Sequence, residues 1–309
     1  MPSFSGSPAM SGPSDGTSSS PARRITPEAV LEALRTVREG RIFDLDIGRF
    51  TGMPSSPVHV PFTVTTYRTP RGLANQRDQA WLAGEENTAE WGFVSEVVIS
   101  SMHTGTHIDA LCHVMRGWGD DATWFGGTRA ADAIGDFGPM QDDAVAIPPL
   151  LVPGLLLDVA KAIGREPLPQ AYGVGVDDLK RALEGIGEFP SGGAVLVRTG
   201  YLMDWPDAEA LATHAGAGIT LEGANWLVEQ FEPVAIGADT PSLEQEPSTV
   251  PGNPAPAHHF LIRDRGIHII ENLALEELSQ SGVTRFLFVC CPLAISGATA
   301  SLVRPLAVS

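Results

Sequence analysis

Short apolar runs alternate with amphipathic stretches along the chain, which predicts strands interleaved with helices. Uninterrupted or nearly uninterrupted apolar runs, typical of buried strands, occupy 155–159, 194–198 and 286–290. Strands are also predicted at 42–45, 96–101, 234–236 and 267–270. Apolar residues at helical spacing predict helices from Pro27, where Thr26 provides the cap, at 177–183, at 221–229 and from Leu275. With no internal repeat, this order favours a single α/β domain.

The ends of this pattern set the expected boundaries of the domain. Residues 1–24 are rich in Ser, Pro and Gly and contain no continuous apolar region, so we expect a disordered tail there and the domain at 25–309. The segments 54–91 and 243–259 are interpreted as long loops, which in a compact domain are commonly functional. No stretch of about 18 apolar residues is present, so no membrane partner is expected.

Composition narrows the functional class. A net charge of −17 argues against a nucleic-acid-binding surface, because phosphate binding needs clustered Lys and Arg. The three cysteines, Cys112, Cys290 and Cys291, cannot build a disulfide framework. We therefore expect a protein of the reducing cytoplasm.

The most informative segment is Ser101–His113, which contains four metal-ligand side chains within eleven residues: His103, His107, Asp109 and His113. Imidazoles combined with a carboxylate suit a first-row divalent ion. The alternative is a set of hydrogen-bonded core histidines, but burying several imidazoles and a carboxylate without a cation costs several kcal/mol unless every polar atom finds a partner. The sequence therefore predicts a metalloenzyme.

The spacing of these four residues also predicts a bend. All four occupy odd positions, which a strand would direct to one face. A fully extended run from His103 to His113 would span roughly 33 Å, whereas ligands of one ion converge within a few ångströms. Gly105 is the expected bend, with His103 at the end of a strand.

A second segment should supply further donors. The candidates are the adjacent pair His258 and His259, which follows a Pro-rich loop, and Glu271, which ends an apolar strand containing His268. An aspartate that bridges two ions, completed by histidines and a glutamate, would form a two-metal hydrolytic site. Taken singly, His258, His268, His59 and His214 are also compatible with structural or surface roles.

The pattern His-x-Gly-Thr-His-x-Asp-x-x-x-His, followed by a later His-x11-Glu pair, resembles the signature of the cyclase family of metal-dependent hydrolases, which includes kynurenine formamidase and isatin hydrolase. The resemblance extends over residues 40–306 and includes the segments 196–200, 237–240 and 269–273. The family often has Pro where Leu111 stands and Phe where Val114 stands. Additional residues at 66–91 and 117–132 indicate a different or larger substrate.

The resemblance implies a swivelling β/β/α fold, a homo-oligomer (dimer or tetramer) and one or two divalent ions, Zn²⁺ or Mn²⁺, per subunit. It implies that His103, His107 and Asp109 bind metal together with His259 and Glu271. His113 matches the catalytic acid/base.

The predicted activity is metal-dependent hydrolysis of an amide, lactam or ester, with His113 moving the proton. Two alternatives remain: a biosynthetic cyclase or dehydratase that uses the same site, and a non-catalytic metal- or ligand-binding protein. The partner is a small molecule. An aromatic substrate is one candidate, because four tryptophans that could wall a pocket lie near the motif: Trp81, Trp91, Trp118 and Trp124.

Overall fold

The computed structural model describes residues 20–76, 88–89 and 91–309. Most of the predicted tail, residues 1–19, lies outside this range. Residues Pro21–Arg24 form a 3₁₀ helix, η1, instead of a disordered end. The Ser20 hydroxyl donates to the Gly266 carbonyl at 2.7 Å, and Arg23 pairs with Asp142 at 2.7 Å. The folded chain therefore begins before the expected boundary at residue 25.

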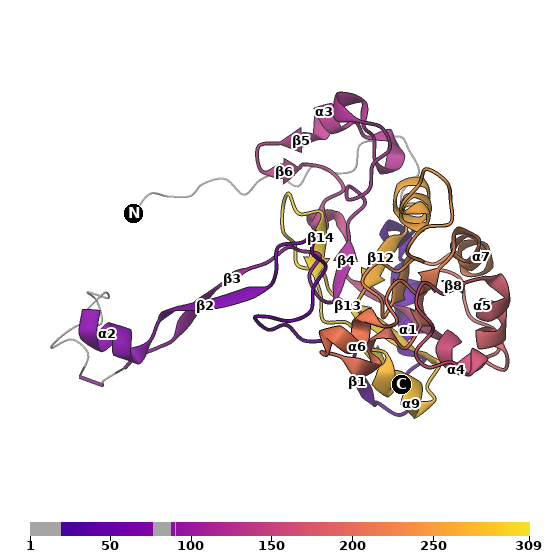
Figure 1. Ribbon diagram of the computed structural model, residues 1–309, viewed down its shortest axis with the longest axis horizontal. Helices are drawn as coiled ribbons and strands as arrows, with labels where there is room; N and C mark the ends of the chain where they lie inside the picture. Colours follow the sequence, from indigo (N-terminus) through magenta and orange to yellow (C-terminus); the bar gives the residue numbers. More distant parts are fainter. Residues whose placement is uncertain (1–19, 77–87, 90) are drawn as a thin grey trace.

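A curled, mixed sheet of nine strands forms the centre of the described chain (Figure 1). In pairing order the strands are β1 (Ile42–Asp44), β15 (Leu306–Val308), β13 (Arg285–Cys290), β7 (Leu150–Asp158), β9 (Ala194–Arg198), β11 (Ala235–Ala238), β12 (His268–Glu271), β4 (His107–Asp109) and β14 (Ala300–Leu302). The four strands from β7 to β12 are parallel, and the pairs outside them are antiparallel. The predicted α/β domain is confirmed.

Successive side chains of the central strands enter two different cores, as the alternation of a strand requires. On β7, Leu156 packs into one cluster while Leu155 and Leu157 pack into the other. β9 repeats this arrangement with Leu196 on one side and Val195 on the other. Both faces of the parallel strands are therefore covered, which explains their almost continuous apolar sequences.

Helices cover these cores. Leu179 of α5 (Val176–Leu183) and Leu227 of α7 (Leu221–Phe231) belong to the second cluster, and Leu278 of α9 (Glu276–Ser281) belongs to the first. α1 (Pro27–Leu34) begins as predicted, with the Thr26 hydroxyl accepting from the Ala29 N–H at 3.2 Å. Shorter elements are α4 (Val159–Ile163), β8 (Gly173–Val174), η7 (Tyr201–Asp204), α6 (Ala208–Ala212), β10 (Gly218–Ile219) and η6 (Ala144–Ala146).

The segment 54–91 was wrongly predicted to be a loop throughout. It contains β2 (Thr63–Arg68) and α2 (Pro70–Gln76), and β2 pairs with β3 (Ser95–Ile99). Figure 1 shows this two-stranded ribbon extending away from the body with α2 at its far end. We call residues 58–76 and 91–99 the arm.

A second projection, residues 117–140, is called the lobe. It comprises η4 (Gly119–Asp121), η5 (Phe125–Gly127), α3 (Ala130–Ala133), β5 (Ile134–Gly135) and β6 (Gly138–Pro139). Figure 1 shows α3, β5 and β6 standing apart from the central sheet. Among the helices of the described residues, none has the length and apolar character needed to cross a membrane.

Candidate metal centre

The expected bend lies where the sequence predicted it. β3 ends at Ile99, a turn follows, and β4 begins at His107. Gly105 has φ +73°, and a Cβ atom there would lie only 3.2 Å from the Arg49 side chain. Because both the backbone angle and the space favour glycine, this turn can fold His103 back towards the strand.

The turn and β4 bring three ligand-type side chains together. Nδ1 of His103 lies 3.0 Å from Oδ1 of Asp109, and Nε2 of His107 lies 3.6 Å from the same oxygen. His107 and Asp109 are two apart on β4 and share one face of it. Side-chain nitrogen and oxygen atoms of these three residues can converge on one ion.

Glu271 reaches this cluster through the sheet. β12 pairs antiparallel with β4, and Glu271 is opposite His107 in the register. Its Oε2 lies 3.3 Å from Nε2 of His107. The predicted convergence of Glu271 with the His103–Asp109 segment is therefore present in the structure.

His258 and His259 are adjacent in sequence but contact different groups, and the contacts differ from the expectation. Nε2 of His258 lies 3.2 Å from Oε1 of Glu271 and 4.0 Å from Oδ2 of Asp109. His259 instead has its Nε2 3.0 Å from the carbonyl of Met115. The structure thus brings His258, and not the expected His259, to the cluster.

A π-helical turn accounts for this difference. The helix that starts as α8 (Pro256–His258) continues as the π-helix η8 (His259–Asp264), where the Arg265 N–H donates to the Phe260 carbonyl five residues earlier. A π turn accommodates one more residue than an α turn and often occurs at functional sites. Counting residues back from Glu271 therefore selects the wrong member of the pair.

Hydrogen bonds fix which ring nitrogen of each histidine faces the cluster. Nδ1 of His107 lies 2.8 Å from the Gly105 carbonyl, so it is the donor and Nε2 is left with its lone pair towards Asp109 and Glu271. Nδ1 of His258 lies 2.5 Å from Oε1 of Glu244, and its Nε2 likewise faces the cluster. Both imidazoles are held in an orientation suited to metal binding.

The sequence did not indicate that Glu244 belongs to this site. This buried carboxylate also accepts the backbone N–H groups of Ala257, at 2.9 Å, and His258, at 3.0 Å. It therefore anchors the start of α8 as well as the imidazole of His258. Glu244 lies in a Pro-rich segment without helical or strand periodicity, so only the fold reveals its partner.

Two overlapping groups of ligand-type residues result. They are His103, His107 and Asp109 on one side and Asp109, His258 and Glu271 on the other, with Asp109 in both. Among the described residues, the buried atoms Nε2 of His107, Oδ1 of Asp109 and Oε1 of Glu271 have no hydrogen-bond partner. Unsatisfied buried nitrogen and oxygen atoms facing one point fit a divalent cation.

The charges of the cluster are strongly coupled. Burial alone would raise the pKa of Asp109, but the neighbouring imidazoles, His113 foremost, hold it well below its ordinary value. Burial likewise opposes ionisation of Glu271, yet its contacts with His107 and His258 lower its pKa. Both carboxylates are therefore ionised at neutral pH and can bind a cation.

His113 lies beside the cluster but is not one of these five ligand-type residues. Its ring centroid is 4.1 Å from that of His103. Burial lowers the pKa of His113 to about 4, although the charge of Asp109 opposes this shift. His113 is therefore neutral at pH 7 and able to accept a proton.

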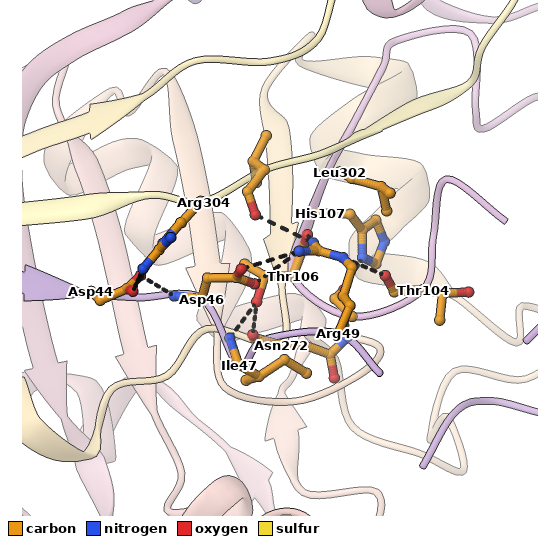
Figure 2. A network of polar contacts seen from close by, with 12 residues as sticks. Asp44, Asp46, Ile47, Arg49, Thr104, Thr106, His107, Asn272, Leu302 and Arg304 are labelled. Carbon is orange, nitrogen blue, oxygen red and sulfur yellow. Dashed lines mark hydrogen bonds and ion pairs between the residues drawn. The ribbon is translucent and has the colours of Figure 1, made fainter. Parts of the chain in front are cut away.

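A network of polar contacts holds residues 104–106 of the turn in place (Figure 2). The Arg49 guanidinium pairs with Asp46 at 3.0 Å and donates to the carbonyls of Thr104, at 3.3 Å, and Thr106. The Asn272 side chain donates to the Gly105 carbonyl at 3.2 Å, and the Thr106 hydroxyl donates to the Asn272 carbonyl at 2.7 Å. Residues adjacent to Glu271 and His107 are thus bonded directly to each other.

The four tryptophans have different surroundings. Trp124 is buried in the core, where its indole N–H donates to Asp142 at 3.1 Å. Trp118 is 93% exposed on the lobe, and Trp91 belongs to the arm. Trp81 lies outside the described residues. Trp124 therefore stabilises the core and is not available as a pocket wall.

Comparison with known proteins places these features in a family. Residues 44–245 match the model of the Cyclase family, which is described as "Putative cyclase". The chain belongs to the cyclase family. The matched region contains the complete turn and β4, so the resemblance seen in the sequence is confirmed. Among curated proteins, none matches the chain.

Solved structures show the same fold over most of the chain. A structure described as a novel cyclase is 27% identical, with a TM-score of 0.79, and the match covers 94% of this chain and 95% of that one. Isatin hydrolase A from Ralstonia solanacearum is 21% identical, with a TM-score of 0.63, and covers 95% and 100% of the two chains. Isatin hydrolase A from Labrenzia aggregata is 21% identical, with a TM-score of 0.62, and covers 86% and 93%.

Proposed function

We propose that this protein is a metal-dependent hydrolase that acts on an amide, lactam or ester of a small molecule. Two groups of ligand-type residues that share Asp109 carry the proposal. They contain buried nitrogen and oxygen atoms that have no hydrogen-bond partner among the described residues. The cyclase-family match and the fold shared with isatin hydrolases support it.

We propose His103, His107 and Asp109 as ligands of one divalent ion, with Asp109, His258 and Glu271 as the donors for a second. His258 takes the role that the family spacing had suggested for His259. Oxygen and nitrogen donors suit either Zn²⁺ or Mn²⁺. An ion held there would act as a Lewis acid on a carbonyl oxygen and lower the pKa of water.

The chain's own residues would perform the proton transfers. His113, neutral at pH 7, accepts a proton from the attacking water and returns it to the leaving nitrogen or oxygen. Glu244 holds the imidazole of His258 in one tautomer. The Arg49 and Asn272 network fixes the turn that orients His107, so these groups need little reorganisation during the reaction.

The test is a substrate panel assayed after metal analysis. The purified protein is stripped of metal, reloaded with Zn²⁺ or Mn²⁺, and assayed with aryl formamides, isatin and lactones. Hydrolysis in ¹⁸O-labelled water should place the label in the product. Turnover without incorporation of the label would contradict a hydrolase and indicate a cyclase or dehydratase, and the absence of turnover with either metal would indicate a binding protein.

We also propose a homo-oligomer in a reducing, cytoplasmic setting. The three cysteines are all free thiols, which supports such a compartment. The arm and the lobe, which carry exposed apolar side chains, support assembly.

A further inference from the structure

His59 lies at the base of the arm, against the ligand-bearing turn. Its ring stacks on that of His103, with the centroids 5.3 Å apart and the two planes inclined by 14°. His59 is half-buried, whereas its neighbours Val58 and Val60 are 81% and 55% exposed. The His59 side chain is therefore turned towards the protein, while the side chains on either side of it face solvent.

Backbone hydrogen bonds hold His59 in this place. The carbonyl of Val60 accepts from the Ser101 N–H at 3.1 Å and from the Thr104 hydroxyl at 3.1 Å. The His59 N–H donates to the Ser56 carbonyl at 3.1 Å, which closes a turn just before the arm. The imidazole is thus positioned beside the metal centre before any ligand binds, which reduces the cost of ordering it.

The ring nitrogens of His103 are both engaged, whereas those of His59 are not. Nδ1 of His103 faces Asp109 at 3.0 Å, and its Nε2 lies 3.0 Å from the Thr299 hydroxyl. Within the described part of the chain, neither ring nitrogen of His59 has a hydrogen-bond partner. Every imidazole carries at least one N–H. His59 therefore presents, beside the metal centre, an N–H that no described residue accepts.

The place of His59 relative to the ligand groups indicates what this N–H can bind. His59 belongs to neither group. Burial lowers the pKa of His59, and the nearby carboxylates Asp109 and Glu271 act in the opposite direction. The ring is therefore close to the carboxylates of the centre but a stacking distance away from the ring of His103. It would meet an atom of the substrate other than the carbonyl oxygen that an ion polarises.

We propose that His59 binds the substrate, donating its ring N–H to an oxygen atom outside the scissile bond. This inference rests on the proposed hydrolase function. It narrows the substrates to amides, lactams or esters that carry a second oxygen acceptor, such as a carboxylate or another carbonyl, near the bond that is cleaved. Because this hydrogen bond is present both in the bound substrate and in the transition state, it contributes to binding and not to the chemical step.

Two variants separate the N–H of His59 from its ring. His59→Phe keeps an aromatic ring against His103 but has no N–H, and His59→Gln keeps an N–H donor without the ring. Val58→Ala is the control, because Val58 is the exposed neighbour in sequence. All three variants should retain the wild-type metal content in elemental analysis, since His59 is in neither ligand group.

The kinetic test compares two aryl formamides that differ by one carboxylate, N-formylanthranilate and formanilide. In metal-loaded protein, His59→Phe should raise KM for N-formylanthranilate about tenfold or more and leave kcat nearly unchanged, as expected when one hydrogen bond to a charged acceptor is lost. His59→Gln should recover most of this loss, and KM for formanilide should stay the same. Wild-type KM in His59→Phe, or equal losses with both formamides, would overturn the role of His59 and leave the hydrolase proposal intact.

A binding measurement tests the same contact without turnover. Calorimetric titration of the metal-loaded protein with anthranilate should give a dissociation constant about tenfold higher in His59→Phe and unchanged in Val58→Ala. This measurement decides the matter if the wild type hydrolyses neither formamide, a result that would count against the proposed function. Equal affinities of the wild type and His59→Phe, or no binding of anthranilate to the wild type, would overturn the proposed contact.

Discussion

Nδ1 of His258 lies 2.5 Å from Oε1 of Glu244, and the same carboxylate accepts two backbone N–H groups from the first turn of the following helix. One buried side chain thus sets both the position of the helix and the tautomer of the imidazole. Carboxylate partners of this kind increase the basicity of a ligating histidine and keep its ring aligned. The consequences can be measured as changes in metal binding and in reaction rate.

Replacing Glu244 by Gln should weaken metal binding by about 10–100-fold, because the partner of His258 loses its charge. Calorimetric titration of metal-stripped protein with Mn²⁺ or Zn²⁺ measures the change. Glu246→Gln is the control, since Glu246 is exposed two residues further along the chain. Unchanged affinity in Glu244→Gln would show that the contact serves the helix alone.

His258→Ala and His259→Ala should differ in bound metal. His258→Ala removes a nitrogen that faces Asp109 and Glu271, so its metal content should fall. His259→Ala removes the contact with the Met115 carbonyl and should retain the wild-type content. Elemental analysis after gel filtration reports both. The reverse outcome would restore the assignment suggested by the family spacing.

His113→Ala should bind metal like the wild type while kcat falls by roughly 10² or more, because a general base is lost. The neutral imidazole expected from its lowered pKa is the form that accepts a proton. Metal content and steady-state kinetics are measured on the same preparation. Full activity with normal metal content would exclude the proposed proton transfer.

Removing the metal should make stability depend on pH. Burial opposes the charged forms of His107 and His258, but Glu271, and for His258 also Glu244, more than compensates, so both pKa values are raised in the folded metal-free protein. A histidine whose pKa is raised on folding stabilises the folded state fully at pH values below its unfolded pKa of 6.5. This stabilisation is lost as the pH rises through the higher pKa of the folded state.

A cation replaces those protons, so added metal should raise the melting temperature more at pH 8.5 than at pH 6. Melting curves of chelator-treated protein with and without metal provide the comparison. If metal raised the melting temperature equally at the two pH values, linked protonation of these histidines would be contradicted.

Thiol labelling tests the packing around β4. Cys291 is exposed and should react rapidly with a maleimide, whereas Cys112 and Cys290 are buried. Burial, followed by the charges of Asp143 and Asp142, raises the pKa of Cys112 to about 12, so little thiolate is present at pH 7.5. Mass spectrometry should find label on Cys291 alone until denaturant is added. Rapid labelling of Cys112 in the native protein would indicate a looser core.

The sequence predicted the parts of the molecule whose side chains follow a regular period. Leu155–Leu157 and Ala194–Arg198 belong to parallel strands buried on both faces, and their apolar runs indicate this directly, although Val159, predicted to be in the strand, begins α4. The bend at Gly105 followed from the spacing of the ligands. These features depend on local sequence and on the reach of an extended chain.

Other features depend on contacts between distant segments. β2 was missed because Thr63–Arg68 is a threonine-rich edge of an exposed ribbon and lacks a buried face. The choice between His258 and His259 depends on a helical turn whose hydrogen-bond pattern the residue types do not reveal. Glu244 was missed because its role exists only once α8 is placed against it.

Because a π-helical turn follows His258, a fixed number of residues does not identify the histidine that faces the metal centre. In this chain the histidine that faces Asp109 and Glu271 precedes Glu271 by 13 positions (271 − 258), one more than the interval His-x11-Glu counts. A search with that fixed interval would select His259, whose ring contacts the Met115 carbonyl instead.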